Sequence, residues 1–223
     1  MPVRHCLTFP FLLFLSLPST QSVLERMDRA AASFRGMTAS VRHVTHTAVI
    51  DDNSTETGTV KMRKLKPGEV EGLIDFTSPD RKIYLFTGRK AQIYTPASKT
   101  VQVYDLGKHG EQLDQFLMIG FGTAEAELER DYDISVLSQE KVEGQGTTLL
   151  QLIPHSKEAL NYVKRMELWI SDATGYPVQE KLHQPSGDSL LVVYDDVKIN
   201  PPLTAADMKL DLPKDVNFLY PQK

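Results

Sequence analysis

Residues 78–104 read SPDRKIYLFTGRKAQIYTPASKTVQVY, and they indicate the architecture of the whole chain. Short runs of β-branched and aromatic residues are separated by turn residues, first at Gly88 and then at Pro96. β-branched and aromatic residues favour strands, whereas Gly and Pro favour tight turns. Short strands that follow one another at intervals of about 8–12 residues are typical of an antiparallel meander. The stretch therefore predicts consecutive antiparallel strands.

The same pattern continues on both sides of this stretch. Alternating apolar and polar residues indicate half-buried strands. Turn signals such as Pro67-Gly68 and Gly144-Gln145-Gly146 separate them. Neither an internal repeat nor a composition break indicates a second domain. The further predicted strands are 37–50, 57–65, 70–76, 134–142, 147–153, 165–170, 178–183 and 189–199.

Two regions have helical rather than strand periodicity. Residues 23–35 carry an apolar stripe at spacings of three and four residues, which predicts an amphipathic helix that stops at Gly36. Residues 111–121 and the acidic stretch 123–130 predict a second helical region. Because a long sheet tends to curl, we expect these helices to cover its apolar concave face. The stripe of the first helix consists of Leu24, Met27, Ala31 and Phe34.

The N-terminus has the composition of a secretory signal. Arg4 gives a basic start, residues 7–17 are almost entirely apolar, and small polar residues follow. The apolar run is shorter than the roughly 20 residues that a membrane span needs. The sequence therefore predicts a removable signal peptide over residues 1–22 and export from the cytoplasm.

Cleavage of this signal is expected after Ser19 or after Ser22. If Ser22 is retained, it can cap the first helix, with Glu25 completing a capping box. The only cysteine, Cys6, would leave with the signal. We therefore expect neither a disulfide, a lipid anchor nor a thiol-based metal site in the remaining single domain, residues 23–223.

Charge and motifs exclude several function classes. Without the signal, 24 Lys and Arg residues stand against 29 Asp and Glu, a net charge of −5, whereas nucleic-acid-binding proteins usually have a strong basic excess. The sequence contains no Gly-x-Ser-x-Gly, phosphate-loop or His-Glu-x-x-His motif. His43 and His46 point to opposite faces of a predicted strand and suit a shared metal poorly. We expect no enzyme activity, no cofactor and no metal.

Several predicted strands are apolar on both faces, which a half-buried strand should not be. Residues 83–86 (IYLF) and 190–194 (LLVVY) are the clearest runs. A sheet covered on both sides would explain them, and so would a sheet whose concave face lines a pocket. From periodicity alone, an ordinary core with a wide contact face is the favoured interpretation.

The order of these elements resembles the LolA-type lipoprotein carriers of the Gram-negative cell envelope. The similarity covers roughly residues 23–218 and is best where a proline turn and a strand are followed by a glycine turn and an aromatic strand ending in Tyr-x-Pro. Gly88, Tyr94 and Pro96 match this pattern at the right spacing. Weaker matches are Leu152-Ile153-Pro154, the turn Asp172-Ala173-Thr174-Gly175-Tyr176-Pro177 and the closing segment 199–213.

The resemblance implies a mainly β (α+β) fold, in which a strongly curved antiparallel sheet forms an incomplete barrel covered by a few helices as a lid. It also implies a soluble, monomeric periplasmic protein that shields lipoprotein acyl chains in an apolar cavity and carries them from the inner to the outer membrane. Its partners would be acylated lipoproteins or other lipids, an inner-membrane ABC-type exporter and an outer-membrane acceptor, and no nucleic acid.

The resemblance also implies site residues on the concave face and on the lid. Many members place an arginine just before a proline, where it binds lid carbonyls; here Lys66 precedes Pro67 and Arg63 lies nearby, so these two are the lid-lock candidates. Lysine does not reproduce the planar guanidinium fork. The expected acyl cavity is lined by Ile74, Phe76, Tyr84, Phe86 and Tyr94 from the sheet and by Phe116, Leu117, Met118 and Ile119 from the lid.

Two alternative functions stay open at this point. One is a carrier of another lipid, because an apolar cavity does not by itself select lipoproteins. The other is an envelope-stress sensor or binding module like the RseB-type regulators. Those regulators add a C-terminal domain, whereas this sequence stops at Lys223, soon after the expected end of the barrel, so we expect the carrier.

Overall fold

The computed structural model describes residues 17–66, 69–107 and 119–222. Its helical elements are α1 (Thr20–Ser33), η1 (Pro96–Ser98), α3 (Glu125–Asp131) and α4 (Lys157–Leu160). No helix within these ranges is long and apolar enough to cross a membrane. The strands are β1 (Gly36–Thr47), β2 (Asp52–Lys66), β3 (Glu69–Ser78), β4 (Lys82–Thr87), β5 (Lys90–Thr95), β6 (Thr100–Asp105), β7 (Tyr132–Val142), β8 (Gln145–Pro154), β9 (Arg165–Ser171), β10 (Pro177–His183), β11 (Ser189–Ile199) and β12 (Asn217–Leu219).

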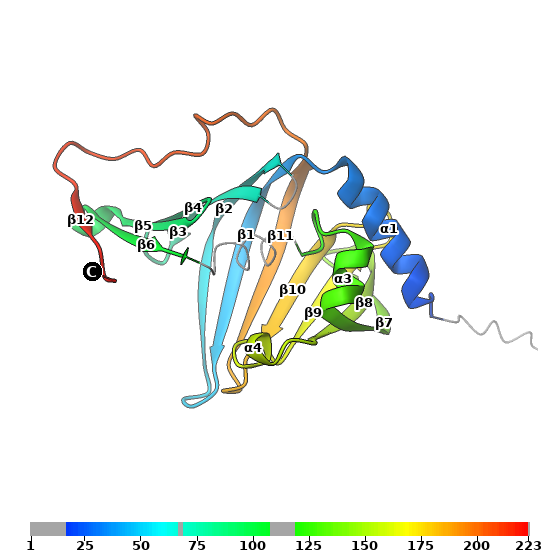
Figure 1. The fold of residues 1–223 in the computed structure, drawn as a ribbon. Helices are drawn as coiled ribbons and strands as arrows, with labels where there is room; N and C mark the ends of the chain where they lie inside the picture. Colours follow the sequence, from blue (N-terminus) through cyan, green and yellow to red (C-terminus); the bar gives the residue numbers. More distant parts are fainter. Residues whose placement is uncertain (1–16, 67–68, 108–118, 223) are drawn as a thin grey trace, which may run out of the picture.

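All the strands within the described residues belong to one sheet, in the order β12-β6-β5-β4-β3-β2-β1-β11-β10-β9-β8-β7. The two edge strands, β12 and β7, do not pair with each other, so the sheet is an incomplete barrel. It bends strongly, and α1 and α3 lie against its inner face (Figure 1). The predicted fold class, a curved sheet covered by a few helices, is confirmed.

Every strand predicted from the sequence is present, with shifted ends. The largest shift is in β2, which begins at Asp52 rather than at residue 57, because it pairs with β1 along the whole of a long hairpin. The acidic helix predicted at 123–130 corresponds to α3. The helix predicted at 111–121 falls mainly on residues 108–118, which lie outside the described residues.

Helix α1 begins one turn earlier than predicted. The Ser19 hydroxyl oxygen accepts a hydrogen bond from the Ser22 backbone N–H at 3.2 Å, so Ser19 is the N-cap and Ser22 lies within the first turn. The predicted capping role of Ser22 is therefore wrong in the full chain. The predicted apolar stripe is confirmed, because all its members, Leu24, Met27, Ala31 and Phe34, are buried.

Polar contacts hold α1 against the far half of the sheet. The buried hydroxyl of Tyr176 donates a hydrogen bond to the Ala30 carbonyl oxygen at 2.8 Å. Arg26 forms an ion pair with Asp172 at 3.0 Å, and the same carboxylate accepts a hydrogen bond from the Thr148 hydroxyl at 2.7 Å. These contacts tie α1 to β8 and to the turn between β9 and β10. Apolar residues near the N-terminal end of α1 pack in one cluster with Leu150, Leu152, Met166, Leu168 and Ile170.

The outer face of β3 to β6 is covered by the segment 200–216, which follows β11 and leads to β12 (Figure 1). Met208 is 3 % exposed and anchors this segment. β12 then pairs with β6 in parallel, with Phe218 opposite Val101. The prediction of a purely antiparallel sheet is therefore wrong at this edge. The outer-face cluster consists of Leu73, Ile83, Leu85, Tyr94, Val101 and Met208, with Val103, Leu210, Leu212 and Val216 packed against it.

The two-faced apolar run at residues 83–86 now has a physical explanation. Ile83 and Leu85 point outward and are buried beneath the C-terminal segment. Tyr84 points inward and packs against the core on the opposite face. Successive strand residues point to opposite faces, so Phe86 also points inward. At these residues the outer face is covered by the C-terminal segment, and the inner face contributes to a cavity, as the second interpretation from the sequence expected.

We predict that Met208→Ala lowers the free energy of unfolding by about 2–4 kcal/mol, because it removes a buried side chain that the outer face cannot refill. Leu219→Ala, at a side chain that is 43 % exposed, should change it by less than about 0.5 kcal/mol. Urea denaturation followed by circular dichroism measures both. Equal effects of the two substitutions would show that the segment 200–216 does not belong to the cooperative core.

Candidate ligand-binding site

The inner face of the sheet contains an apolar cavity of about 200 Å³. Its wall is built by side chains from β1 to β4 and from β9 to β11, so it lies in the middle of the curved sheet. Most of its surface is aliphatic or aromatic carbon. The lining residues are Val41, His43, Val60, Met62, Ile74, Phe86, Met166, Glu180, Lys181, Leu182, Leu190, Val192 and Tyr194.

Strand register explains why these residues meet. Directly opposed residues in paired strands point to the same face. Val60 of β2 lies opposite Ile74 of β3, and Val192 of β11 lies opposite both His43 of β1 and Glu180 of β10. Alternation along each strand therefore gathers one side-chain row per strand on the inner face.

The sequence placed Ile74, Phe76, Tyr84 and Phe86 together, and the structure puts all four on the inner face. Ile74 and Phe86 line the cavity. Phe76 and Tyr84 continue the same surface as an aromatic row. In this row the His43 and Phe76 ring centroids are 4.7 Å apart, those of Phe76 and Tyr84 are 5.8 Å apart, and those of Tyr84 and Phe86 are 6.5 Å apart. Their role in binding an acyl chain stays a prediction.

Tyr94 was placed on the wrong face. It lies opposite Ile83 in the β4–β5 pair and is buried in the outer-face cluster. A shift of one residue along the strand separates this face from the face that lines the cavity. Ile119 is 2 % exposed, packs with α1, β8 and β9, and does not itself line the cavity. The other predicted lid residues, Phe116, Leu117 and Met118, lie outside the described residues.

The lid-lock candidates are both paired with acids. The Arg63 guanidinium donates to Oε2 of Glu71, from Nε at 3.1 Å and from Nη2 at 2.6 Å. Met62 lines the cavity, so strand alternation points Arg63 to the outer face. Lys66 pairs with Glu69 at 2.8 Å on the surface. A locking role for either residue stays a prediction.

Sequence reasoning missed the polar residues of the cavity. Glu180 lines the cavity together with Tyr194, and its Oε1 atom is inaccessible to solvent and has no hydrogen-bond partner. Burial raises the pKa of Glu180 to about 8 and raises that of Tyr194 as well. Burial lowers the pKa of His43 to about 4, so its imidazole is neutral near pH 7. The sequence does contain a pattern that points to Glu180, because this residue alternates with the apolar residues Val178 and Leu182 on β10.

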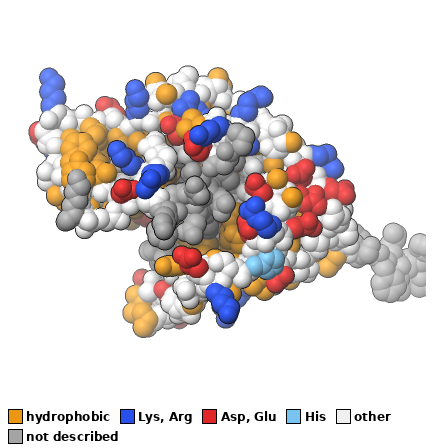
Figure 2. Space-filling model, viewed as in Figure 1, with side chains coloured by type: hydrophobic (Ala, Val, Ile, Leu, Met, Phe, Trp, Pro, Cys, Tyr) orange, Lys and Arg blue, Asp and Glu red, His pale blue; other side chains and the backbone are white. Residues whose placement is uncertain are grey.

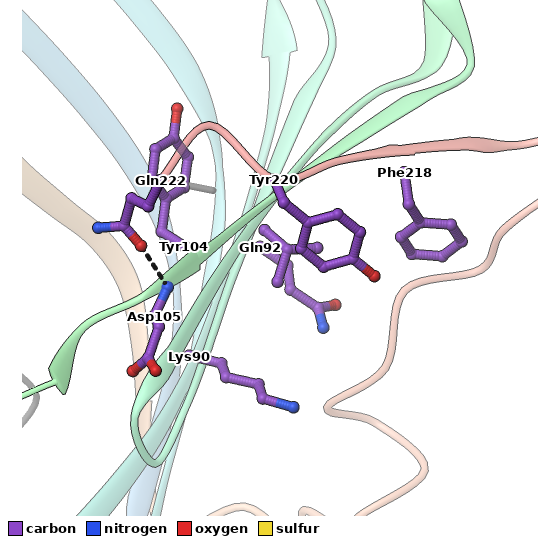
Figure 3. Close-up of a pocket in the computed structure, with 8 residues that line it drawn as sticks. Lys90, Gln92, Tyr104, Asp105, Phe218, Tyr220 and Gln222 are labelled. Carbon is purple, nitrogen blue, oxygen red and sulfur yellow. Dashed lines mark hydrogen bonds between the residues drawn. The ribbon is translucent and has the colours of Figure 1, made fainter.

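A second hollow, of about 470 Å³, lies at the β12 edge of the sheet, between β5, β6 and the C-terminal strand. Figure 3 shows the rings of Phe218 and Tyr220 near Gln92, and the Gln222 side chain bonded to the Asp105 backbone N–H at 2.8 Å. Exposed hydrophobic side chains gather at this edge in Figure 2. This hollow is more open to solvent than the inner-face cavity, and its lining includes Lys90, Gln92 and Asp105, so it suits a buried apolar ligand less well.

Within residues 17–66, 69–107 and 119–222, no group of three or more His, Cys, Asp or Glu side chains is arranged to hold a metal ion. His43 lies on the inner face opposite Val192, and His46 lies opposite Ser189 after an odd number of steps along β1. The predicted separation of these two histidines onto opposite faces is confirmed.

Comparison with known proteins informs the fold. No family model and no curated protein matches the sequence. Among solved structures, an uncharacterized conserved protein from Thermus thermophilus matches with a TM-score of 0.52 and 15 % identity, over 90 % of this chain and 98 % of that one. MucB matches with a TM-score of 0.51 and 15 % identity, over 85 % of this chain and 62 % of that one.

A LolA superfamily protein, NE2245 from Nitrosomonas europaea, also matches, with a TM-score of 0.41 and 15 % identity over 87 % of this chain and 99 % of that one. The solved structures with TM-scores above 0.5, the Thermus thermophilus protein and MucB, share the overall fold of this chain. At these identities the likeness concerns the fold alone. What the chain binds must therefore be argued from its own cavity.

We predict that the free energy of unfolding falls as pH rises from 6.5 to 8. The folded protein holds the Glu180 proton up to about pH 8, whereas the unfolded chain loses it near pH 4.5. Stability therefore decreases in this interval by up to about 1.4 kcal/mol per pH unit. His43 does not oppose the loss there, because its stabilising effect changes only between about pH 4 and 6.5.

Glu180→Gln should remove this slope while keeping the shape of the side chain. Urea unfolding of both proteins at pH 6.5, 7.2 and 8 measures it, and the wild-type minus variant difference cancels other titrating groups. Parallel pH profiles would mean that Glu180 is already ionised in the folded protein.

Proposed function

We propose that the protein is a soluble periplasmic carrier that shields the acyl chains of lipoproteins in the inner-face cavity and moves them from the inner to the outer membrane. The observation that carries this proposal is an apolar cavity that persists between two well-packed core clusters. Protein interiors are closely packed, so an apolar cavity of this size in the centre of a sheet is a candidate ligand-binding site.

The energetics favour hydrocarbon as that ligand. An acyl chain in water exposes many methylene groups, and each contributes about 0.8 kcal/mol when it is buried. Side chains such as Val41, Ile74 and Phe86 offer such a chain only carbon. The cavity holds the volume of roughly seven water molecules, so it admits part of a long chain. The aromatic row of Phe76 and Tyr84 extends the apolar surface for the rest.

The outer face supports the same assignment by elimination. On β3 to β6 the C-terminal segment already covers the outer-face residues, with Met208 at their centre. In this half of the sheet, we therefore propose that a ligand contacts apolar side chains of the inner face. A signal peptide over residues 1–22, a single domain over 23–223, an inner-membrane exporter and an outer-membrane acceptor complete the proposal.

The lipoprotein cargo is tested with a matched pair of baits. One is a lipoprotein with its N-terminal acyl groups, and the other is the same protein without them, made by replacing its acylated cysteine. We expect the acylated form alone to form a complex with this protein in detergent-free buffer, as judged by size-exclusion chromatography. Mass spectrometry of solvent extracts identifies bound lipid. Free lipid in the extract together with no lipoprotein complex would favour a carrier of another lipid.

We predict that Val192→Phe weakens binding of a fluorescent fatty-acid probe roughly tenfold, a loss of about 1.4 kcal/mol, because the larger ring occupies the cavity. Leu191→Phe is the matched control, since the neighbouring residue points to the outer face opposite Val44. Fluorescence titration gives both affinities, and thermal unfolding confirms that both variants fold. Equal probe binding by wild type and Val192→Phe would place the ligand elsewhere.

A further inference from the structure

The turn between β1 and β2 exposes two aliphatic side chains. Val49 is 90 % exposed and Ile50 is 67 % exposed. Turns are dominated by Gly, Pro, Asn, Asp and Ser, whereas β-branched residues such as these favour strands. Because both side chains lie in solvent, packing does not explain why the turn carries them.

A third exposed apolar side chain lies at the same end of the sheet. Tyr162, which follows α4, is 68 % exposed. It lines a surface hollow together with Pro185 and Ser186 of the β10–β11 turn. The β1–β2 turn, the β10–β11 turn and α4 all lie at the lower end of the molecule in Figure 1. Among the described residues, Val49, Ile50 and Tyr162 are the three most exposed large apolar side chains, so apolar exposure is concentrated at this end.

The β1–β2 turn is held in place by its neighbour. The Ala48 backbone N–H donates a hydrogen bond to Oδ1 of Asp188 at 2.8 Å, and the Ser186 hydroxyl donates to Oδ2 of the same carboxylate at 2.9 Å. Within the turn, the Asp51 backbone N–H donates to the Ala48 carbonyl oxygen at 3.3 Å. A turn that is ordered in advance loses little conformational entropy when it binds a partner.

The inner-face cavity reaches towards this end of the sheet. Leu182 lines both the cavity and the surface hollow beside Tyr162. Leu190, which lies opposite Leu182 in the β10–β11 pair, also lines the cavity. The exposed apolar side chains therefore lie at the end where the cavity wall adjoins the surface.

The shape and charge of this end favour a lipid bilayer over a protein as the partner. A stable protein interface buries about 800 Å² on each partner, whereas the β1–β2 turn offers a few side chains at the tip of a hairpin (Figure 1). Aliphatic and tyrosine side chains suit the boundary between headgroups and acyl chains. The charged residues that follow the tip, Asp51 and Asp52, are acids, so they do not attract anionic lipids. A bilayer with neutral headgroups fits these features.

We propose that Val49 and Ile50 insert into the surface of a neutral lipid bilayer, with Tyr162 at the level of the headgroups. This inference rests on the proposed function, because it names the surface by which the carrier meets a membrane. Two short side chains bury less hydrocarbon than a myristoyl chain, which by itself binds membranes only marginally. The contact is therefore weak and reversible, as a protein that moves between membranes requires.

The test is flotation with vesicles of phosphatidylcholine. The protein is recovered after export from a Gram-negative host, and its mass confirms that the apolar signal, which would itself bind lipid, has been removed. Wild type is compared with a variant that carries Val49→Ser and Ile50→Ser. The matched control carries Leu137→Ser and Leu219→Ser, which remove two apolar side chains that are 44 % and 43 % exposed on the two edge strands.

We expect the Val49→Ser and Ile50→Ser variant to partition onto these vesicles about tenfold more weakly than wild type, because it no longer buries aliphatic surface. The control should stay within about twofold of wild type. Adding one third of phosphatidylglycerol to the vesicles should not strengthen binding by wild type, since Asp51 and Asp52 adjoin the tip. All variants should bind the fluorescent fatty-acid probe as wild type does, because none of the substituted residues lines the cavity.

A fluorescent label reports whether the tip itself enters the lipid. Cys6 is the only cysteine and lies in the predicted signal, so Val49→Cys gives the exported chain a single labelling site. An environment-sensitive dye at this site should shift its emission to shorter wavelengths when phosphatidylcholine vesicles are added. The same dye on Leu219→Cys should keep its emission, because β12 lies away from the bilayer in the proposed orientation.

Three results overturn the inference. If wild type binds the fatty-acid probe but does not float with phosphatidylcholine vesicles, the tip serves a protein partner and the proposed function still stands. If the Val49→Ser and Ile50→Ser variant floats as wild type does, the membrane contact lies elsewhere. If wild type floats only with anionic vesicles, charge rather than apolar insertion drives binding. Failure of the proposed function is seen separately, as loss of probe binding and of the lipoprotein complex by a protein that still floats.

Discussion

The structure depends on removing both faces of one sheet from water. Strands β3 to β5 carry large apolar side chains on each side, and an uncovered face of that size would drive aggregation. On the outer face the C-terminal segment supplies Met208, Leu210 and Leu212 as a cover. On the inner face α1 and Phe121 supply the cover, with the Phe34, Phe121 and Tyr176 rings about 6 Å apart.

Among the described residues, the inner cover leaves the cavity unfilled. One core cluster forms around α1 and β7 to β9, and the other around β1 to β3 and the aromatic rings. Between them, β10 and β11 present Glu180 and Tyr194 instead of two further aliphatic residues. These two side chains place a carboxyl and a hydroxyl group among the aliphatic residues that line the cavity.

Sequence patterns predicted the positions of the strands well, but they predicted less well which face of the sheet each side chain occupies. Ile74, Phe76, Tyr84 and Phe86 share a face as expected, because alternation within β3 and β4 is uninterrupted. Tyr94 does not, because the turn at Gly88 sets a register in which it opposes Ile83 instead of Tyr84. A shift of one residue across a turn moves every side chain to the other face. Glu180 was visible in the pattern of β10 and was passed over because its partners lie on other strands.

Alternation and turn residues were enough to establish a meander, an amphipathic first helix and strands with two apolar faces, since these properties depend on neighbours along the chain. The parallel pairing of β12 with β6 and the burial of Ile83 and Leu85 under the C-terminal segment depend on contacts more than a hundred residues apart. The state of Glu180 depends on which side chains surround it, and strand order brings His43 and Tyr194 into that cavity. Desolvation depends on the side chains that folding brings together, so only the tertiary structure determined which apolar residues are covered by distant segments of the chain.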